Sequence, residues 1–161
     1  VCSQKGIKVP KIVIEPGRSI AAPAGITLYR VGSVKEIKNV RKYVAVDGGM
    51  TDNPRYAMYQ AKYDAVIVDR PDAPRTEKVT IAGKCCESGD ILIKDIMLPE
   101  VKSGDVLAVF TTGAYKYSMS SNYNRIPRPP IVLVKDGKAR IIVKREDYGD
   151  VIRNDIIPED L

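Results

Sequence analysis

The sequence predicts a mainly β fold, an antiparallel β-barrel or sandwich with short helices, for this chain of 161 residues. Two observations support this prediction. Short runs of β-branched and aromatic residues recur along the chain, and turns containing glycine or proline separate them. In the run IVLVKDGKARIIV, Asp136 and Gly137 stand between two apolar segments, a pattern typical of a tight β-hairpin.

The β-type runs define the expected strands in chain order. The first stops at the run from Glu15 to Arg18, where Pro16 and Gly17 together force a turn. The third ends at Asp47-Gly48-Gly49, a second break in the pattern. Strands are expected at Lys11–Ile14, Gly25–Val34, Lys42–Val46, Ala65–Val68, Glu77–Ala82, Ile91–Ile93, Asp105–Phe110, Pro130–Val134 and Ala139–Val143.

Two short helices are expected between and after these strands. Asn53-Pro54 opens a helical turn, because proline is favoured at the first helical position. Arg55 and Tyr59 follow with a spacing of four residues, so their side chains share one helix face. A closing helix is predicted within Arg145–Asn154.

Composition limits the class of protein. With 44% hydrophobic residues the chain is long enough for one sizeable core, and its apolar runs are far shorter than the roughly 20 residues of a membrane helix. The N-terminus lacks a signal-peptide core and does not begin with Met, so the chain is expected to be internal to a longer product. Three cysteines, an odd number, favour a reducing compartment, and we expect a cytoplasmic protein.

The charge balance and the absence of histidine limit the chemistry. A net charge of +6 favours an anionic partner, which leaves nucleic acid, a phosphate cofactor and a dicarboxylate substrate open. Because the chain has no His, catalysis must use Cys, Glu, Asp, Tyr, Lys or Arg.

The run GKCCESGD, residues 83–90, is the strongest candidate for an active-site loop. A disulfide between the adjacent Cys85 and Cys86 would be strained, and the pair lacks the second ligand pair of a metal site, so no metal is expected. Two buried thiols are a further alternative, because free cysteine packs as a small hydrophobe. The polar run from Glu87 to Asp90 argues against burial of the whole segment.

Two other segments carry functional side chains. The run EPGR, residues 15–18, is either a solvated surface turn or an anion site formed by backbone N–H groups and the Arg18 guanidinium. The long loop from Thr112 to Arg128 is rich in Tyr, Ser and Asn. Its aromatic and basic residues also suit a surface for single-stranded nucleic acid, formed by Tyr115, Tyr117, Tyr123, Arg125 and Arg128.

Four motifs in this order, EPGR, DGGMxDNPRxAxY, GKCCESGD and TGAYxYSMxSNYNRIPRP, closely resemble the C-terminal half of the diaminopimelate decarboxylases. These are fold-type III pyridoxal phosphate enzymes related to ornithine decarboxylase and alanine racemase. The similarity extends from about Lys11 to about Val143. EPGR and GAY are shared across the wider decarboxylase superfamily, whereas CCESGD and SNYN point to the diaminopimelate branch.

The resemblance implies a particular domain organisation. Residues 1–18 would be the end of a (β/α)8 barrel, and residues 19–161 would form the C-terminal β domain of the alanine racemase and ornithine decarboxylase type. The N-terminal barrel, which carries the lysine that holds the cofactor, is absent from this chain, so the chain alone should be inactive. A unit that exists deliberately without the barrel, for dimerisation or regulation, is the alternative.

The resemblance also implies a reaction, the decarboxylation of meso-2,6-diaminopimelate to L-lysine and CO2, with pyridoxal 5'-phosphate as cofactor. Decarboxylation of another basic amino acid is the alternative within this class. A homodimer with a shared active site is implied, because the Cys-Glu loop of the family reaches into the partner's site. A small-molecule amino-acid substrate is therefore expected, without nucleic acid or membrane as a partner.

The resemblance assigns roles to individual residues, each by its match to a family motif. Glu15 would pair with the pyridine nitrogen of the cofactor, and Pro16, Gly17 and Arg18 would hold the cofactor phosphate. By the same resemblance Arg18 would also contact a substrate carboxylate, and Arg55 and Tyr59 would contact the distal carboxylate of the substrate. Glu87 would contact the distal amino group, and Tyr115 would lie near the cofactor and the substrate. Cys86 matches the proton donor of the family. A thiol, with an ordinary pKa of about 8.5, is a serviceable acid at neutral pH. Cys85 matches no role, and we expect it to pack beneath the loop.

Overall fold

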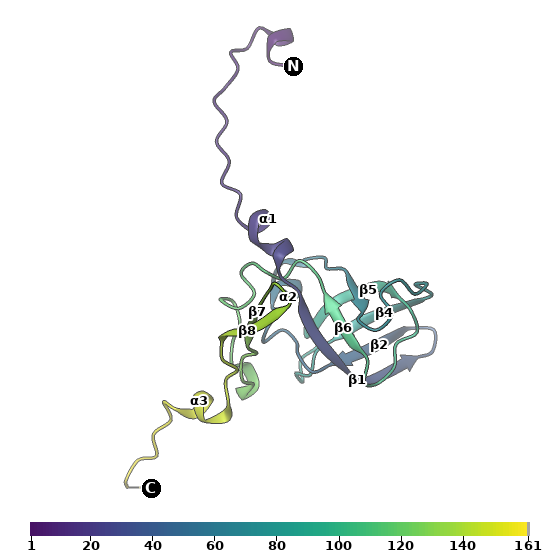
Figure 1. The fold of residues 1–161 in the computed structure, drawn as a ribbon, viewed down its shortest axis with the longest axis vertical. Coiled ribbons are helices and arrows are strands. Elements are labelled where there is room, and N and C mark those ends of the chain that lie inside the picture. The colour runs from purple at the N-terminus through teal and green to yellow at the C-terminus, as the bar shows by residue number, and fades with distance from the viewer. Residues whose placement is uncertain (161) are drawn as a thin grey trace.

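The computed structural model describes residues 1–160, and most of its regular structure is β-strand (Figure 1). The strands are β1 (Thr27–Ile37), β2 (Arg41–Val46), β3 (Ala65–Ile67), β4 (Glu77–Ala82), β5 (Ile91–Leu98), β6 (Val106–Val109), β7 (Ile131–Lys135) and β8 (Lys138–Val143). The α-helices are α1 (Arg18–Ala21), α2 (Arg55–Tyr59) and α3 (Tyr148–Ile152), and the 3-10 helices are η1 (Ser3–Lys5), η2 (Ala22–Ala24) and η3 (Tyr123–Arg125). The predicted mainly β class is confirmed.

Six strands form one sheet in the order β3-β6-β1-β2-β4-β5. The two edge strands β3 and β5 contact each other, so the sheet nearly closes into a barrel. The pairing is mixed and not purely antiparallel as predicted, because β2 and β4 run parallel. A parallel pair needs a long crossover, and residues 47–76 between the two strands provide it. This crossover carries α2.

Strand β1 is longer than predicted and belongs to both sides of the barrel. Thr27–Arg30 pairs with β6, whereas Val31–Ile37 pairs with β2. The register of the β1–β2 pair shifts between Val31 and Ser33, where Gly32 lies. Such an irregularity bends a strand, as closure of a sheet requires.

The core fills the barrel with aliphatic side chains that alternate along the strands. The largest fully buried ones include Ile67, Ile81, Leu92, Leu98 and Leu107. Tyr29 of β1 is also buried, at 3% exposure, and is the only aromatic residue of the buried cluster within residues 1–160. A polar phenol in this position needs a partner for its hydroxyl group.

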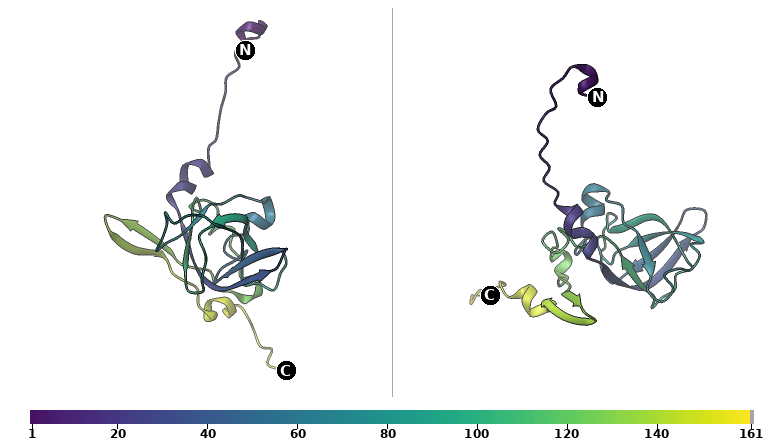
Figure 2. Two further views of the ribbon diagram at one scale, coloured as in Figure 1. Left: turned by 90° about the vertical axis from the view of Figure 1, so that its right-hand side faces the viewer. Right: turned by 45° about the horizontal axis from the view of Figure 1, so that its top comes forward.

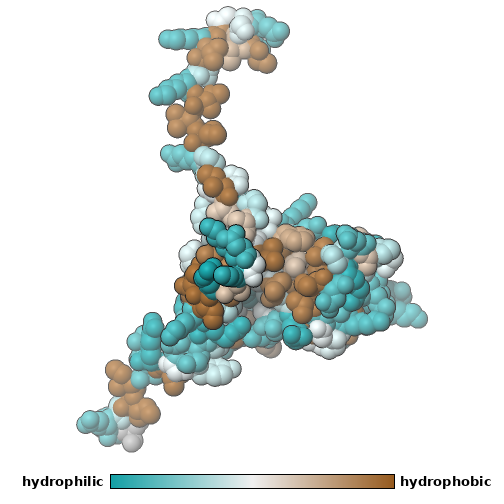
Figure 3. Space-filling view, in the orientation of Figure 1, coloured by the Kyte–Doolittle hydropathy of each residue, from teal (hydrophilic) through white to brown (hydrophobic). Residues whose placement is uncertain are grey.

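The first 17 residues extend away from the barrel (Figures 1 and 3). The predicted strand Lys11–Ile14 is wrong within this chain, because these residues pair with no strand among residues 1–160. The Ile12, Val13 and Ile14 side chains are each more than 70% exposed. An apolar β-type run forms a strand only where a neighbouring strand supplies hydrogen bonds, and nothing in the described residues does so here.

The β7–β8 hairpin stands apart from the barrel, as both views of Figure 2 show. Asp136 and Gly137 occupy its turn with φ values of 52° and 70°, which confirms the predicted hairpin. Helix α3 lies inside the predicted range and begins with a capping box formed by Asp147 and Asp150. It buries no residue, so it does not close a core within the described part of the chain. No helix of residues 1–160 has the length and apolar character needed to cross a membrane.

Candidate active site

The loop between β4 and β5 carries Cys85, Cys86 and Glu87, and the buried Asp90 at its end fixes its shape. One carboxylate oxygen of Asp90 accepts a hydrogen bond from Cys85 N at 2.7 Å, and the other accepts one from Met50 N at 2.6 Å. Asp90 is only 3% exposed. The carboxylate therefore joins the cysteine loop to the Gly-Gly turn that precedes α2.

Two glycines leave the space that the Asp90 carboxylate occupies. A Cβ at Gly83 would lie 2.2 Å from both carboxylate oxygens, and a Cβ at Gly49 would lie within 2.7 Å of them. Sequence reasoning missed the role of Asp90, although each of the three residues stands in one of the motifs. The signal that could have found it is the pair of glycine-containing turns, since glycine often marks a close approach of another group to the backbone.

The two cysteines differ in their surroundings. Cys86 is exposed, whereas Cys85 is partly buried and both are free thiols. Burial, followed by the nearby Asp90 carboxylate, raises the pKa of Cys85 to about 11. The Glu87 carboxylate accepts hydrogen bonds from Ser88 Oγ at 3.3 Å and from Gly89 N at 3.2 Å. The loop thus presents one thiol outward and keeps the other protonated.

The EPGR turn and the TGAY segment meet at Gly17 and Tyr115. A Cβ at Gly17 would lie 2.5 Å from the Tyr115 hydroxyl oxygen, so only glycine allows this approach. Behind it, Gly113 N donates to Ala22 O at 3.0 Å and holds the segment against η2. Tyr115 has a φ of 64°, a left-handed conformation that costs a non-glycine residue free energy and is often found at functional sites.

Arg55 lies between two tyrosines. Its guanidinium carbon is 5.2 Å from the centre of the Tyr59 ring, which is on the same face of α2, and 6.0 Å from the centre of the Tyr115 ring. The Arg55 Nε atom is buried and has no hydrogen-bond partner among the described residues. A buried donor without a partner is costly, and a bound anionic group would satisfy it.

The structure brings together some of the residues predicted for the site and leaves others apart. Gly17, Arg55, Tyr59 and Tyr115 form one cluster, with Arg18 next to Gly17 at the start of α1. Among residues 1–160, no hydrogen bond or ion pair joins the side chains of Cys86 or Glu87 to this cluster. Glu15 and Pro16 lie exposed in the N-terminal segment.

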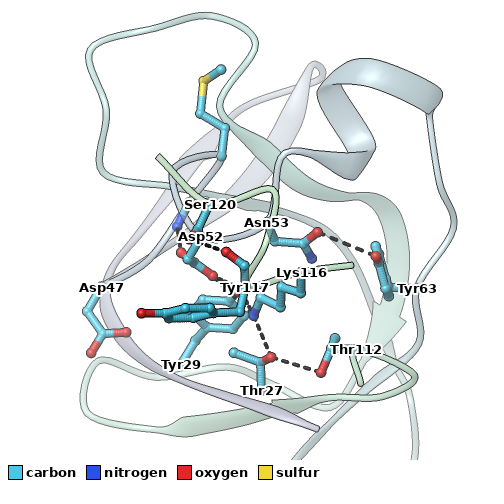
Figure 4. A network of polar contacts seen from close by, with 12 residues as sticks. Thr27, Tyr29, Asp47, Asp52, Asn53, Tyr63, Thr112, Lys116, Tyr117 and Ser120 are labelled. Atoms are coloured by element: carbon cyan, nitrogen blue, oxygen red, sulfur yellow. Dashed lines mark hydrogen bonds and ion pairs between the residues drawn. The ribbon is translucent and has the colours of Figure 1, made fainter. Parts of the chain in front are cut away.

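A buried polar network around Lys116, the residue after Tyr115, was not foreseen from the sequence (Figure 4). The Tyr29 hydroxyl donates to Asp52 Oδ2 at 2.5 Å, and Lys116 Nζ lies 3.1 Å from the same oxygen. Burial lowers the pKa of Lys116, and Asp52 opposes this effect. Burial, and after it the Asp52 carboxylate, raises the pKa of Tyr29 well above its ordinary value. Tyr29 thus remains a neutral hydrogen-bond donor to Asp52.

The remainder of the long loop is held by ion pairs. The Glu146 carboxylate accepts hydrogen bonds from Arg128 N, Arg128 NH1 and Asn122 Nδ2 at 2.7 to 2.8 Å. These bonds, of which the one from the Arg128 backbone matters most, lower the pKa of Glu146 to about 2. Arg125 pairs with Asp155 at 2.8 Å. Because both arginines already contact carboxylates, the structure gives no support to the alternative of a nucleic-acid surface.

Comparisons with known proteins identify the family. Residues 10–113 match the family described as the C-terminal sheet domain of pyridoxal-dependent decarboxylases. The chain is 60% identical over 154 residues to the diaminopimelate decarboxylase of Bacillus subtilis, covering 96% of this chain and 35% of the relative.

Solved structures extend the comparison. The diaminopimelate decarboxylase of M. jannaschii in complex with L-lysine superimposes with a TM-score of 0.84 at 41% identity, over 98% of this chain and 36% of that one. A lysine/ornithine decarboxylase from Vibrio vulnificus complexed with cadaverine gives 0.61 at 26% identity, over 71% of this chain and 31% of that one. The chain spans about a third of the length of these proteins. It belongs to the family of pyridoxal-dependent decarboxylases, in which its β-barrel is the C-terminal sheet domain.

Proposed function

We propose that this chain is the C-terminal part of a diaminopimelate decarboxylase, which converts meso-2,6-diaminopimelate to L-lysine and CO2. The observation that carries the proposal is the cluster at Arg55, whose buried Nε atom has no partner among the described residues and whose guanidinium lies between Tyr59 and Tyr115. This cluster suits a substrate carboxylate, because the planar guanidinium binds carboxylates in a defined orientation. The high identity to the B. subtilis enzyme supports the same substrate.

The residues around Gly17 fit pyridoxal phosphate. Arg18 follows Gly17 at the start of α1, and the Tyr115 hydroxyl lies close to Gly17, which has no Cβ, so both side chains would supply donors for the phosphate. Pro16 fixes the backbone before this turn. Glu15 is a carboxylate for the ring nitrogen, which it would keep protonated. When bound, the cofactor supplies an electron sink for the electron pair left by the departing CO2.

The remaining roles divide the substrate between two groups of residues. Arg18 would also contact a substrate carboxylate, while Arg55 and Tyr59 would hold the distal carboxylate. Glu87 would contact the distal amino group, and Cys86 would deliver the proton that replaces CO2. The exposure of Cys86, and the absence within residues 1–160 of a hydrogen bond or ion pair from the Cys86 or Glu87 side chain to the cluster at Arg55, support a site completed by a second copy of the chain. The homodimer belongs to this proposal.

Other parts of the proposal concern the whole protein. The lysine that holds the cofactor would lie in an N-terminal (β/α)8 barrel, so the chain alone would not decarboxylate the substrate. The boundary at residues 18 and 19 remains a prediction. A cytoplasmic location is supported by the three free thiols, which suit a reducing compartment.

The test is made on the whole protein that contains this chain. Cys86→Ala should slow CO2 release from meso-diaminopimelate about 100-fold or more while the absorbance of bound cofactor is retained. Cys85→Ala, one residue away on the same loop, should keep turnover close to that of the unchanged protein. Full activity of Cys86→Ala would exclude the role of Cys86. The second candidate is a decarboxylase of another basic amino acid, and the weaker similarity to the Vibrio vulnificus enzyme is the observation that favours it. Faster CO2 release from ornithine or lysine than from diaminopimelate would support this candidate.

A further inference from the structure

Lys116 stands in an unusual place for a lysine, because its side chain is only 11% exposed inside the end of the barrel. Its ammonium group has three N–H donors, and three acceptors surround it: Asp52 Oδ2 at 3.1 Å, the Tyr29 hydroxyl at 2.9 Å and Thr27 Oγ1. Every donor therefore has a partner, and Figure 4 shows these side chains converging. The protein holds the cation at a defined point.

The groups that accept hydrogen bonds from Lys116 also make hydrogen bonds to other segments of the chain. The Tyr29 hydroxyl, which accepts from Lys116, donates to Asp52, and the other Asp52 oxygen accepts from Gly49 N at 2.7 Å. Thr27 Oγ1, which also accepts from Lys116, donates to Thr112 Oγ1 at 2.9 Å. Along both paths each hydroxyl group accepts a hydrogen bond from Lys116 and donates its own proton to the next oxygen. One cation thus ties strand β1 to the turn before α2 and to the start of the TGAY segment.

The two tied segments carry the cluster proposed to bind the substrate. Lys116 directly follows Tyr115, whose left-handed φ of 64° needs support from its surroundings. Asp52 lies three residues before Arg55, at the N-terminal end of α2. Tyr115 and Arg55 are far apart in the sequence, and their separation of 6.0 Å depends on how the two segments are fixed to each other.

We propose that Lys116 is a positioning residue, which holds Tyr115 and Arg55 in register through Asp52, Tyr29 and Thr27. A contribution to the stability of the fold is a weak explanation for the buried ion pair of Lys116 and Asp52, because apolar side chains of similar size often replace such a pair without loss of stability. The inference rests on the proposed function only where it concerns the substrate. The part that concerns the position of the TGAY segment stands on the contacts alone.

The test compares two lysines in the whole protein that contains this chain. Lys116→Met removes the central cation, and Lys42→Met removes the ion pair with Glu77, 2.6 Å long, on the distant side of the sheet. Amide hydrogen exchange without substrate reports on Gly113 N, bonded to Ala22 O, and on Met119 N, bonded to Tyr115 O at 2.9 Å. If Lys116→Met does not fold, Lys116→Gln takes its place against the same control.

We expect exchange at these two amides to rise about ten-fold in Lys116→Met, and KM for diaminopimelate to rise about ten-fold with a smaller change in kcat. Lys42→Met should change neither by more than about two-fold. Equal exchange and equal KM in the two variants would overturn the positioning role. If the unchanged protein does not decarboxylate diaminopimelate, the proposed function fails, and the exchange comparison still decides whether Lys116 holds the segment.

Discussion

Replacing Gly83 by alanine should loosen the connection between the cysteine loop and the turn before α2, leaving the backbone hydrogen bond from Lys84 N to Gly48 O as the remaining link. The new methyl group would lie 2.2 Å from both Asp90 carboxylate oxygens, so the carboxylate must move by about 1 Å to reach an ordinary contact distance. Such a shift breaks its hydrogen bonds to Cys85 N and Met50 N, which are 2.7 and 2.6 Å long. Two hydrogen bonds to a buried charge are worth about 3 to 4 kcal/mol together.

Hydrogen exchange measures this loss locally. A cost of about 3 to 4 kcal/mol raises the opening constant roughly 100- to 1,000-fold, which should appear in peptides that contain Met50 and Cys85. Gly89→Ala is the matched control on the same loop, because its Cβ would meet only Glu87 Oε1, at 3.8 Å. If the two variants exchange at the same rate in these peptides, Asp90 does not hold the loop as described.

Three further predictions concern the proposed substrate cluster, the proposed cofactor turn and the long loop. Arg55→Lys should raise KM for diaminopimelate about ten-fold in steady-state assays, because a lysine lacks the planar fork that lies between the tyrosine rings, and an unchanged KM would contradict the contact. Gly17→Ala and Tyr115→Phe should each weaken binding of pyridoxal phosphate in a titration, the first because its methyl meets the Tyr115 hydroxyl and the second because that donor is lost. Their effects should be less than additive in the double variant, and strictly additive effects would exclude this clash. The pKa of Glu146 is lowered in the folded state from 4.5 to about 2, so its contribution to stability is complete above pH 4.5 and is lost as the pH falls toward 2. Chemical denaturation of Glu146→Gln should show less loss of stability across this interval than the unchanged protein, and identical pH profiles would refute the assignment.

The features that could be predicted from the sequence are those that depend on a few neighbouring residues, such as tight turns and helix starts. The β7–β8 hairpin follows from the positive φ that its two turn residues must adopt, and Asp and Gly at positions 136 and 137 tolerate it. Helix α2 starts where Asn53-Pro54 indicated, with Pro54 at the N-cap. Strand β5 continues to Leu98, beyond its predicted end at Ile93. The in-and-out alternation of its side chains is interrupted at Asp95, which has a φ of 56°, so a strict alternating pattern does not reveal the second half of the strand.

The features that were missed depend on contacts between distant parts of the chain. Asp90 meets Met50 across 40 residues, and Lys116 meets Tyr29 across 87. No periodicity in the sequence records such pairs. The parallel alignment of β2 and β4 has the same origin, since it depends on the path of the crossover and not on the composition of either strand.

That crossover also has a kinetic consequence. The 30 residues of the chain between β2 and β4 must close a loop before the parallel pair can form, and loop closure is the slow part of folding for non-local pairings. Arg55 and Tyr59 lie on this loop, so they reach their final places only when the sheet around them is complete. A newly made chain would therefore acquire the cluster proposed for the substrate at the end of folding, together with the barrel.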